Sequence, residues 1–378
     1  MKMIQKTFSF RLKPTKEQLI LFAKFAGSTR YIFNYGLALI KEAMEGKQKV
    51  PTYTDIANKL PYLKRSTETA WLKEIHSQVL QHSLKNLESA FKHFFRRLKN
   101  KEKPGFPRFK KKGDNDSFRY PQGVSCGNAK VYLPKIGWVA YRDSRLIEGI
   151  IKQATIKREG KHWNIHIVCE IEIDIQKVSV SEKKAIGIDL GIKNFAYLSD
   201  GQVIENQKIL NTYLKKLAFL QRHYAHKKKG SNNQKKIAVK VAKVHRLIKN
   251  IRKDFHHKLS TNIAKNHGVV AVENLNIKGM VLNRRLSRAI ADAGWCGFVN
   301  YLEYKCIWLG KNFVKVGRFL PSSKQCSSCG NVQNISLQTR VYTCGNCGLQ
   351  LDRDLNASLN IRAAGLSAFK ACGELSIS

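Results

Sequence analysis

The sequence predicts an α+β protein of several domains, in which a β-domain interrupted by a helical segment precedes an α/β domain. Three observations predict this class. Strand-like alternation at residues 4–12 resumes only after about residue 117, and the residues between have helical periodicity. After residue 184, apolar strands each carry a single carboxylate. At 378 residues, the chain is long enough for two or three domains with their own cores.

The composition favours a polyanionic partner. Lys and Arg number 68 against 27 Asp and Glu, which gives a formal net charge of +41. Charge repulsion on this scale destabilises an isolated compact chain, so we expect nucleic acid as the partner. The N-terminal residues lack the apolar run of a signal peptide, and no stretch approaches the ~20 apolar residues of a membrane span. We therefore expect no membrane partner and a cytoplasmic location.

The first half of the chain is predicted to contain one strand, a series of helices and then an antiparallel β-domain. Residues 4–12 alternate polar and apolar side chains, and residues 16–103 are largely helical by period. The last of these helices carries an apolar stripe that is typical of helix packing rather than of base stacking. The stripe consists of Leu80, Leu84, Leu87, Phe91, Phe94 and Leu98. From about 117 to 176, β-branched and aromatic residues alternate around the turn sequence REGKH, which predicts a small barrel that the first strand joins.

Two basic segments are candidates for contact with a phosphate backbone. Residues 96–112 form a basic linker, and its prolines are expected to end the preceding helix. Residues 206–265 contain one acid, Asp254, and are predicted to form an amphipathic helix pair whose apolar face packs on a sheet. The alternatives are a solvated charged loop and a helix pair on a lipid surface. The candidate contacts are Arg108, Lys110, Lys111, Lys112, Lys227, Lys228 and Lys229.

The strongest single motif is C-x2-C-x14-C-x2-C, which consists of Cys326, Cys329, Cys344 and Cys347. Two thiolates two residues apart chelate one ion from a tight turn. The glycine after each pair permits the left-handed backbone that directs amides at sulfur. Residues 331–343 are predicted to form a hairpin between the pairs, so a closed S4 site for one structural zinc is expected. Two disulfides or a redox pair are the alternatives, and a reducing cytoplasm favours the metal.

Three carboxylates lie where a strand ends or a helix begins. Asp189 lies inside AIGIDLG, where its burial is costly unless a cation or hydrogen-bond donors meet it; a turn-capping role is the alternative. Glu273 ends the apolar strand of GVVAVENLNI, and Asp354 lies near a helix start, where it can also act as the N-cap. Carboxylates converging from such positions suit a pair of divalent ions in phosphodiester hydrolysis.

Several motifs together resemble one known family. GIDLGIKNFAYLSDG, VVAVENLNI and CSSCG…YTCGNCGLQLDRDLNASLNI resemble the RuvC-like nuclease domain of TnpB, the transposon-encoded RNA-guided endonucleases related to type V CRISPR effectors. FRLKPTKEQ, GFPRFKKK and LSRAIADAGW also resemble that family, so the likeness spans nearly the whole chain. The resemblance implies that Asp189, Glu273 and Asp354 are catalytic and bind two Mg²⁺ ions. Asp352, in the same DRD sequence, is the less favoured ligand.

The resemblance also implies a division into domains. The expected parts are a β-barrel-like domain at 1–15 and 104–181, a helical recognition insertion at 16–103, a RuvC/RNase H-like nuclease domain at 182–320 and 350–378, and a zinc ribbon at 321–349. The nuclease domain is thus expected to carry the ribbon as an insertion that delivers Asp354.

The function implied by the resemblance is Mg²⁺-dependent cleavage of DNA in the prokaryotic cytosol or nucleoid. The implied partners are a guide RNA transcribed from the end of the element and double-stranded target DNA with a short target-adjacent motif. Gln78 and Gln81 share one helix side and either face target DNA or form an exposed polar face. One alternative is a nuclease-inactive RNA-guided DNA-binding protein, which the presence of all three carboxylates disfavours. The other is a transposase or accessory protein with an RNase H-like fold, which the N-terminal motifs disfavour.

Overall fold

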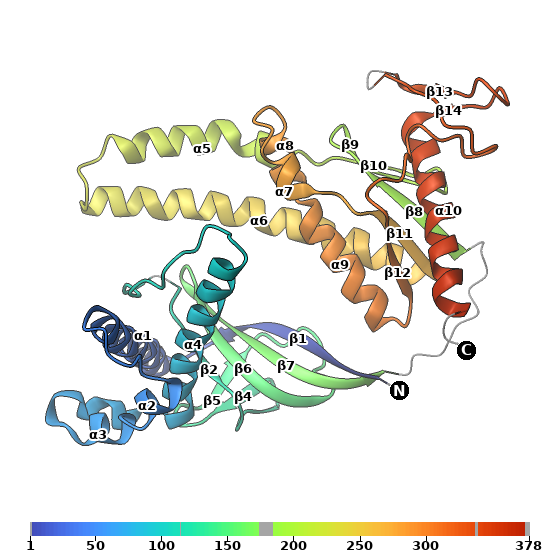
Figure 1. Cartoon of the computed structure of the whole chain (residues 1–378). Helices are drawn as coiled ribbons and strands as arrows, with labels where there is room; N and C mark the ends of the chain where they lie inside the picture. The colour runs from blue at the N-terminus through green and yellow to red at the C-terminus, as the bar shows by residue number, and fades with distance from the viewer. Residues whose placement is uncertain (1, 114, 174–183, 337–338, 375–378) are drawn as a thin grey trace. The chain divides into compact units, whose positions relative to one another are not determined.

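The protein is described by a computed structural model that covers residues 2–113, 115–173, 184–336 and 339–374 (Figure 1). The chain divides into two compact units, Met1–Ile173 and Asp174–Ser378. The domain boundary predicted between residues 181 and 182 lies outside the described residues. Among those residues, no helix has both the length and the apolar character needed to cross a membrane.

The first unit begins with strand β1 (Lys2–Lys13), followed by a helical layer. Helix α1 starts at a capping box, in which the Thr15 hydroxyl accepts from the Gln18 N–H and the Gln18 side chain accepts from the Thr15 N–H. The helical elements are α1 (Lys16–Glu45), α2 (Tyr53–Ala57), α3 (Leu60–Arg65), the 3-10 helix η1 (Thr67–Glu74) and α4 (Ser77–Lys99).

Helix α4 packs as its apolar stripe predicts over most of its length. Leu80, Leu84, Leu87 and Phe91 are buried in the core of the unit, whereas Leu98 at the helix end is exposed. The helix ends at Lys99, with Asn100 as its C-cap, before either proline of the linker. The prediction that the prolines end this helix is therefore wrong.

The strands of the first unit form one seven-stranded sheet in the order β2-β6-β7-β1-β5-β4-β3. Its remaining strands are β2 (Ser117–Tyr120), β3 (Ser125–Gly127), β4 (Lys130–Leu133), β5 (Gly137–Tyr141), β6 (Ile150–Glu159) and β7 (His162–Ile173). Strand β1 pairs antiparallel with β7 along most of its length and with β5 at Leu12 and Lys13.

This sheet is open, so the predicted closed barrel is wrong. Strands β2 and β3 stand at its two ends, and each pairs with one neighbour among the described strands. Helices cover the apolar face instead, since the Phe22 and Phe25 rings of α1 contact the Phe118 ring of β2 at centroid distances of 5.7 and 5.2 Å. Because helix packing buries that face, closure of the sheet is not needed to remove it from water.

The second unit is built on a five-stranded mixed sheet in the order β10-β9-β8-β11-β12. Strand β11 is parallel to β8 and β12, whereas β9 and β10 are antiparallel additions. The strands are β8 (Ala185–Leu190), β9 (Asn194–Leu198), β10 (Val203–Glu205), β11 (Val269–Glu273) and β12 (Asn312–Val316).

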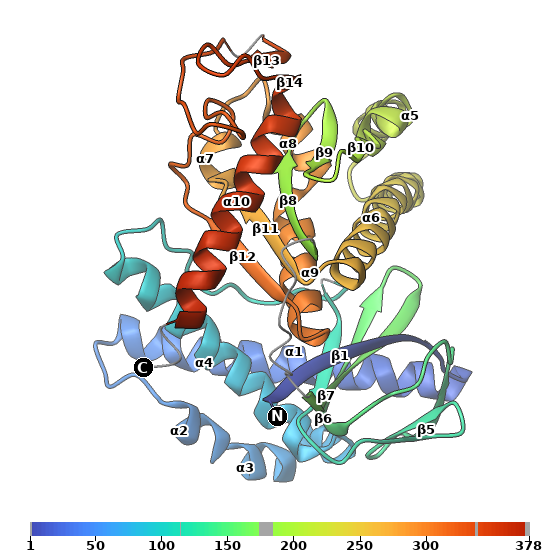
Figure 2. The same ribbon diagram turned by 90° about the vertical axis from the view of Figure 1, so that its right-hand side faces the viewer.

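Helices cover both faces of this sheet, as expected for buried parallel strands (Figure 2). Helices α6 and α9 pack against one face, and α10 packs against the other through Ile361, which contacts Ala271 and Val316. The helices are α5 (Ile209–Ala225), α6 (Asn232–Asn266), α7 (Ile277–Met280), α8 (Ser287–Ala293), α9 (Trp295–Trp308) and α10 (Arg353–Glu374).

Helix α6 divides its apolar face between two partners, although the sequence predicted that it would pack on a sheet alone. Val244 and Ile248 in its first part pack on Ile209 and Leu217 of α5, and only the last part of α6 reaches the sheet core. A helix of 35 residues is about 50 Å long, more than a short-stranded sheet can cover.

The cysteine segment ends in a two-stranded sheet, in which β13 (Val341–Thr343) pairs antiparallel with β14 (Gln350–Asp352). The sequence predicted a hairpin within 331–343, between the cysteine pairs. In the described part of that stretch, which excludes 337–338, β13 is the only strand and its partner lies after the second cysteine pair. The β-ladder therefore encloses the second pair.

Candidate active site and metal centre

Asp189 and Glu273 occupy corresponding positions on neighbouring parallel strands. The register pairs Ile188 of β8 with Val272 of β11, so the next residue on each strand is one of the two acids. Residues that are side by side in a ladder project from the same face of the sheet. The two carboxylates thus extend from one face, at the carboxyl ends of the two central strands.

Helix α10 lies on this same face with its backbone in close approach. A Cβ atom at Gly187 of β8 would collide with the backbone of Ser358 and Arg362 in α10. Because side chains two apart on a strand share a face, Asp189 faces the same side as Gly187. Glycine at 187 is therefore what lets the helix lie against the strand that carries Asp189.

The start of α10 supplies the third carboxylate. Asp354 lies one helical turn before Ser358, in the first turn of the helix. From there the charge of Asp354 raises the pKa of Asp189, so the two carboxylates lie near enough to repel each other. The fold therefore brings Asp189, Glu273 and Asp354 to one side of the sheet from two strand ends and one helix start, although their carboxylate oxygens do not all lie within 4.8 Å of one another.

The electrostatics of this acidic group favour a bound cation. Burial first, and then the charges of Asp354 and Glu273, raise the pKa of Asp189 to about 7. Burial also raises the pKa of Glu273. Arg353 partly offsets these effects at Asp189. Carboxylate oxygens are the ligands that hard divalent ions prefer, so the donor set fits Mg²⁺.

Asp354 and its neighbour Asp352 have different partners. The Asp354 carboxylate accepts from the Arg353 guanidinium at 3.0 Å and lies 3.9 Å from that of Arg340. Oδ1 of Asp352 accepts from the backbone N–H groups of Asp354 and Leu355, at 2.9 and 3.2 Å. Asp352 is therefore the N-cap of α10, and the prediction that Asp354 could take that role is wrong.

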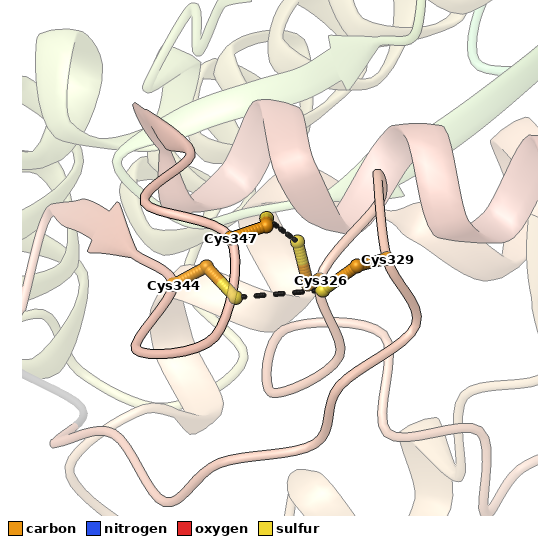
Figure 3. A group of neighbouring side chains, drawn as sticks. All are labelled: Cys326, Cys329, Cys344 and Cys347. Carbon is orange, nitrogen blue, oxygen red and sulfur yellow. Dashed lines mark hydrogen bonds between the residues drawn. The ribbon is translucent and has the colours of Figure 1, made fainter.

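The four cysteines form a compact cluster (Figure 3). Their sulfur atoms all lie within 4.8 Å of one another; Cys326 and Cys347 are 3.6 Å apart, as are Cys329 and Cys344. Tetrahedral zinc with Zn–S bonds of ~2.3 Å implies S···S distances of about 3.8 Å. Within the described ranges, no other set of three or more Cys, His, Asp or Glu ligands is gathered this tightly.

Backbone amides prepare the cluster for thiolates. Gly330 and Gly348 adopt the predicted left-handed conformation, with φ of +76° and +72°. The backbone N–H groups of Cys347 and Asn346 lower the pKa of the Cys344 thiol to about 6. The neighbouring cysteine sulfurs raise the pKa of the Cys347 thiol to about 11, so it is the placement of four sulfurs around one point that favours a metal over a disulfide.

Two buried asparagines, which the sequence analysis did not single out, join the cysteine cluster to α10. Asn356 Oδ1 accepts from the N–H of Ser327 at 2.9 Å, and Asn356 Nδ2 donates to the Gln325 carbonyl at 2.7 Å. One turn later, Asn360 donates to the same carbonyl and to that of Ser322. The signal in the sequence was an i, i+4 pair of asparagines at the helix start.

The predicted nucleic-acid contacts are divided between the two units. In the linker, Lys110 places its ammonium 3.9 Å from the Phe33 ring centroid, and its backbone exchanges two hydrogen bonds with the Asn34 side chain. Gln78 is half-buried on α4. Lys110 and the remaining candidates are exposed, the latter being Gln81, Arg108, Lys111, Lys112, Lys227, Lys228 and Lys229.

Models of known families match three parts of the chain. Residues 166–284, which include Asp189 and Glu273, match OrfB of IS605, described as "Probable transposase". Residues 295–361, which include the cysteine cluster and Asp354, match "Cas12f1-like, TNB domain". Residues 1–49 match "Helix-turn-helix domain", although residues 16–45 form one continuous helix here.

Relatives match over nearly the full length. InsQ of Escherichia coli K12, named as a candidate RNA-guided DNA endonuclease, is 38% identical over 99% of this chain and 95% of its own. A protein of Streptomyces pristinaespiralis with the same designation is 35% identical over 99% and 92%. The Cas12f1 structure determined with guide RNA and target DNA covers 95% of this chain and 99% of its own, with a TM-score of 0.59 at 16% identity, which shows a shared fold.

Proposed function

The chain belongs to the TnpB family of RNA-guided DNA endonucleases, and from that premise we propose that it hydrolyses DNA phosphodiesters under the direction of a guide RNA. The observation that carries the proposal is the gathering of Asp189, Glu273 and Asp354 on the face of the β8–β11 pair that α10 covers. Such a group of half-buried carboxylates is costly unless cations neutralise it.

The three carboxylates would hold two Mg²⁺ ions in this proposal. Bound there, Mg²⁺ would supply an activated water and a stabilised leaving oxygen. The protein's own part is to position the carboxylates. The strand register aligns Asp189 with Glu273, the Asp352 cap fixes the first turn that carries Asp354, and Arg353 balances part of their charge until cations bind.

We also propose that the cysteine cluster holds one structural zinc. All four positions are filled by protein sulfurs, which leaves no open position for substrate. Asn356 and Asn360 tie the first cysteine turn to α10, so a folded ribbon would hold the helix that bears Asp354. The ribbon's part in cleavage is thus to position a catalytic carboxylate.

The proposed partners are a guide RNA and duplex target DNA with a short adjacent motif. The net charge of +41 and the exposed lysines of the α5–α6 turn support contact with such polyanions. We propose Gln78 and Gln81 of α4 for the target and the linker basic residues for the backbone. In this proposal, the protein cleaves DNA in the cytosol or nucleoid. We retain the division at 16–103, 104–181, 182–320, 321–349 and 350–378 as the proposed domain boundaries.

The test combines RNA sequencing with cleavage. A short RNA that matches the downstream flank of the gene should co-purify, and the complex should cut a matching duplex with Mg²⁺. Asp189→Ala, Glu273→Ala and Asp354→Ala should each abolish cutting and leave RNA and target binding nearly unchanged, because the lysines supply most of the affinity. Sequence-specific cutting without RNA, or full cutting by any of the three variants, would contradict the proposal. A nuclease-inactive protein would bind the guided target and leave it intact.

A further inference from the structure

The first unit contains a polar pocket that neither the acidic group nor the cysteine cluster uses. The pocket has a volume of about 140 Å³ and lies among α1, α4, the basic linker, β2 and β6. Its polar lining includes His82, Asn86, Lys110, Arg119 and Thr155. A water molecule takes up about 30 Å³ in the liquid, so the pocket has room for an anion the size of a phosphate group.

Cationic donors converge in this pocket without an acid. His82, Lys110 and Arg119 line it, and no Asp or Glu does so within the described part of the chain. The Nε atom of Arg119 is buried and lacks a hydrogen-bond partner there. A buried guanidinium donor without an acceptor is costly, and three positive or protonatable groups around one space repel each other.

Two arginines near the pocket are paired with a carboxylate. Arg30 of α1 and Arg158 of β6 both approach the Asp116 carboxylate, at 3.1 and 3.7 Å. Arg119, three residues further along the chain, has no such carboxylate in the pocket lining. Within the described lining of the pocket, the chain therefore supplies no acid that could pair with Arg119.

The desolvation of the donors agrees with this reading. Burial, together with the charges of Arg119, Lys85 and Lys110, lowers the pKa of His82 to about 4. Burial also lowers the pKa of Lys110 and of Arg119. A dianionic or monoanionic guest would relieve each of these penalties, since every donor there gains from negative charge.

We propose that this pocket binds one phosphodiester group of a nucleic-acid backbone, held by Arg119 and Lys110. The planar guanidinium of Arg119 can grip two phosphate oxygens, Lys110 adds a point charge, and Asn86 and Thr155 offer neutral hydrogen bonds. The proposal rests on the proposed function for the identity of the polymer. Its chemistry is common to RNA and DNA, and the experiment separates the two.

The first measurement needs no RNA. Thermal unfolding of the nucleic-acid-free full-length chain is followed in phosphate and in chloride at equal ionic strength, for the wild type, Arg119→Met and the exposed control Arg65→Met. Phosphate should raise the wild-type Tm more than chloride does, Arg119→Met should lose that excess, and Arg65→Met should keep it. Arg119→Met should fold without phosphate, because the Nε bond that it removes is not made. An undiminished excess in Arg119→Met overturns the proposal.

The second measurement identifies the polymer. Affinities for the guide RNA, and of the guided complex for target duplex, are measured against salt for the same variants and for Lys110→Gln, which leaves the backbone bonds to Asn34 in place. If the bound phosphate belongs to the guide RNA, Arg119→Met and Lys110→Gln should weaken RNA binding about tenfold; if it belongs to the target DNA, they should weaken duplex binding by the same factor. In either case the slope of log affinity against log salt should fall by about one. Losses no larger than those of Arg65→Met in both arms overturn the assignment. If the wild-type protein binds no RNA, the proposed function is contradicted. The Tm difference between phosphate and chloride still tests whether the pocket binds phosphate.

Discussion

The backbone N–H of Asp354 donates to Oδ1 of Asp352 across 2.9 Å, so the residue that caps helix α10 lies two positions before the proposed catalytic carboxylate. The two aspartates of the DRD sequence are therefore separated by role. One is held against backbone amides, and the other pairs with the guanidinium of Arg353 and raises the pKa of Asp189 through its charge.

The roles of the two aspartates predict different effects on stability and cleavage. Asp352→Ala removes the cap and should lower the free energy of unfolding by about 1 kcal/mol, with a modest loss of cleavage. Asp352→Asn keeps an acceptor oxygen and should preserve both. Asp354→Asn should abolish cleavage with little effect on stability. Denaturant unfolding and a cleavage assay measure the two quantities, and equal loss of cleavage from Asp352→Asn and Asp354→Asn would reverse the assignment.

The close approach of α10 to β8 predicts that Gly187→Ala disrupts the acidic group. The added Cβ collides with the backbone of Ser358 and Arg362, so α10 must move away. We expect a loss of about 1–3 kcal/mol in unfolding free energy and a large loss of cleavage. Gly317→Ala is the matched control, because its Cβ would meet no atom within 4 Å. If Gly187→Ala cuts DNA as well as this control, the position of α10 does not set the site.

The sulfur geometry predicts one tightly bound zinc per chain. Cys344→Ser removes a thiolate that two backbone amides stabilise, so zinc content measured by elemental analysis should fall from about one toward zero. Cys296→Ser changes an exposed cysteine outside the cluster and should keep the metal. A folded, active and zinc-free wild-type preparation would refute the structural role.

The asparagine links predict that ribbon and helix can be uncoupled without loss of metal. Asn356→Ala leaves the Ser327 N–H without its acceptor and removes one donor from the Gln325 carbonyl. We expect about 1–3 kcal/mol lower stability and slower cleavage, with zinc retained. Loss of zinc together with cleavage would show instead that Asn356 maintains the metal site itself.

The buried His256 predicts acid destabilisation of the second unit. Burial lowers the pKa of its imidazole from 6.5 to about 4, with Arg252 adding to the effect, while Nε2 lies 2.9 Å from the Ala293 carbonyl. Because the folded pKa is depressed, this contribution to stability is complete above about pH 6.5 and is lost as the pH falls toward 4. His256→Gln, which keeps a donor, should flatten the dependence of unfolding free energy on pH across that window. An unchanged slope would exclude His256 as the source.

Features that depend on neighbouring residues could be predicted from the sequence. The CxxC pairs with following glycines are local, since two ligands and the turn that holds them lie within five residues. The apolar runs around Asp189 and Glu273 likewise mark strands that bury one carboxylate each. Composition alone identified a polyanionic partner, because charge needs no fold to be counted.

Features that depend on pairing between distant segments were decided by the tertiary structure. The sheet of the first unit stays open because α1 and α4 bury its apolar face, and α6 divides its face because α5 folds back on it. The pocket around Arg119 forms where β2 packs against α4 and the linker, and none of the described residues that line it is an acid. The capping role of Asp352 was set by where α10 begins, and that start depends on the ribbon and on Gly187 of β8. Local chemistry thus selected the reacting groups, whereas long-range packing determined which of them meet.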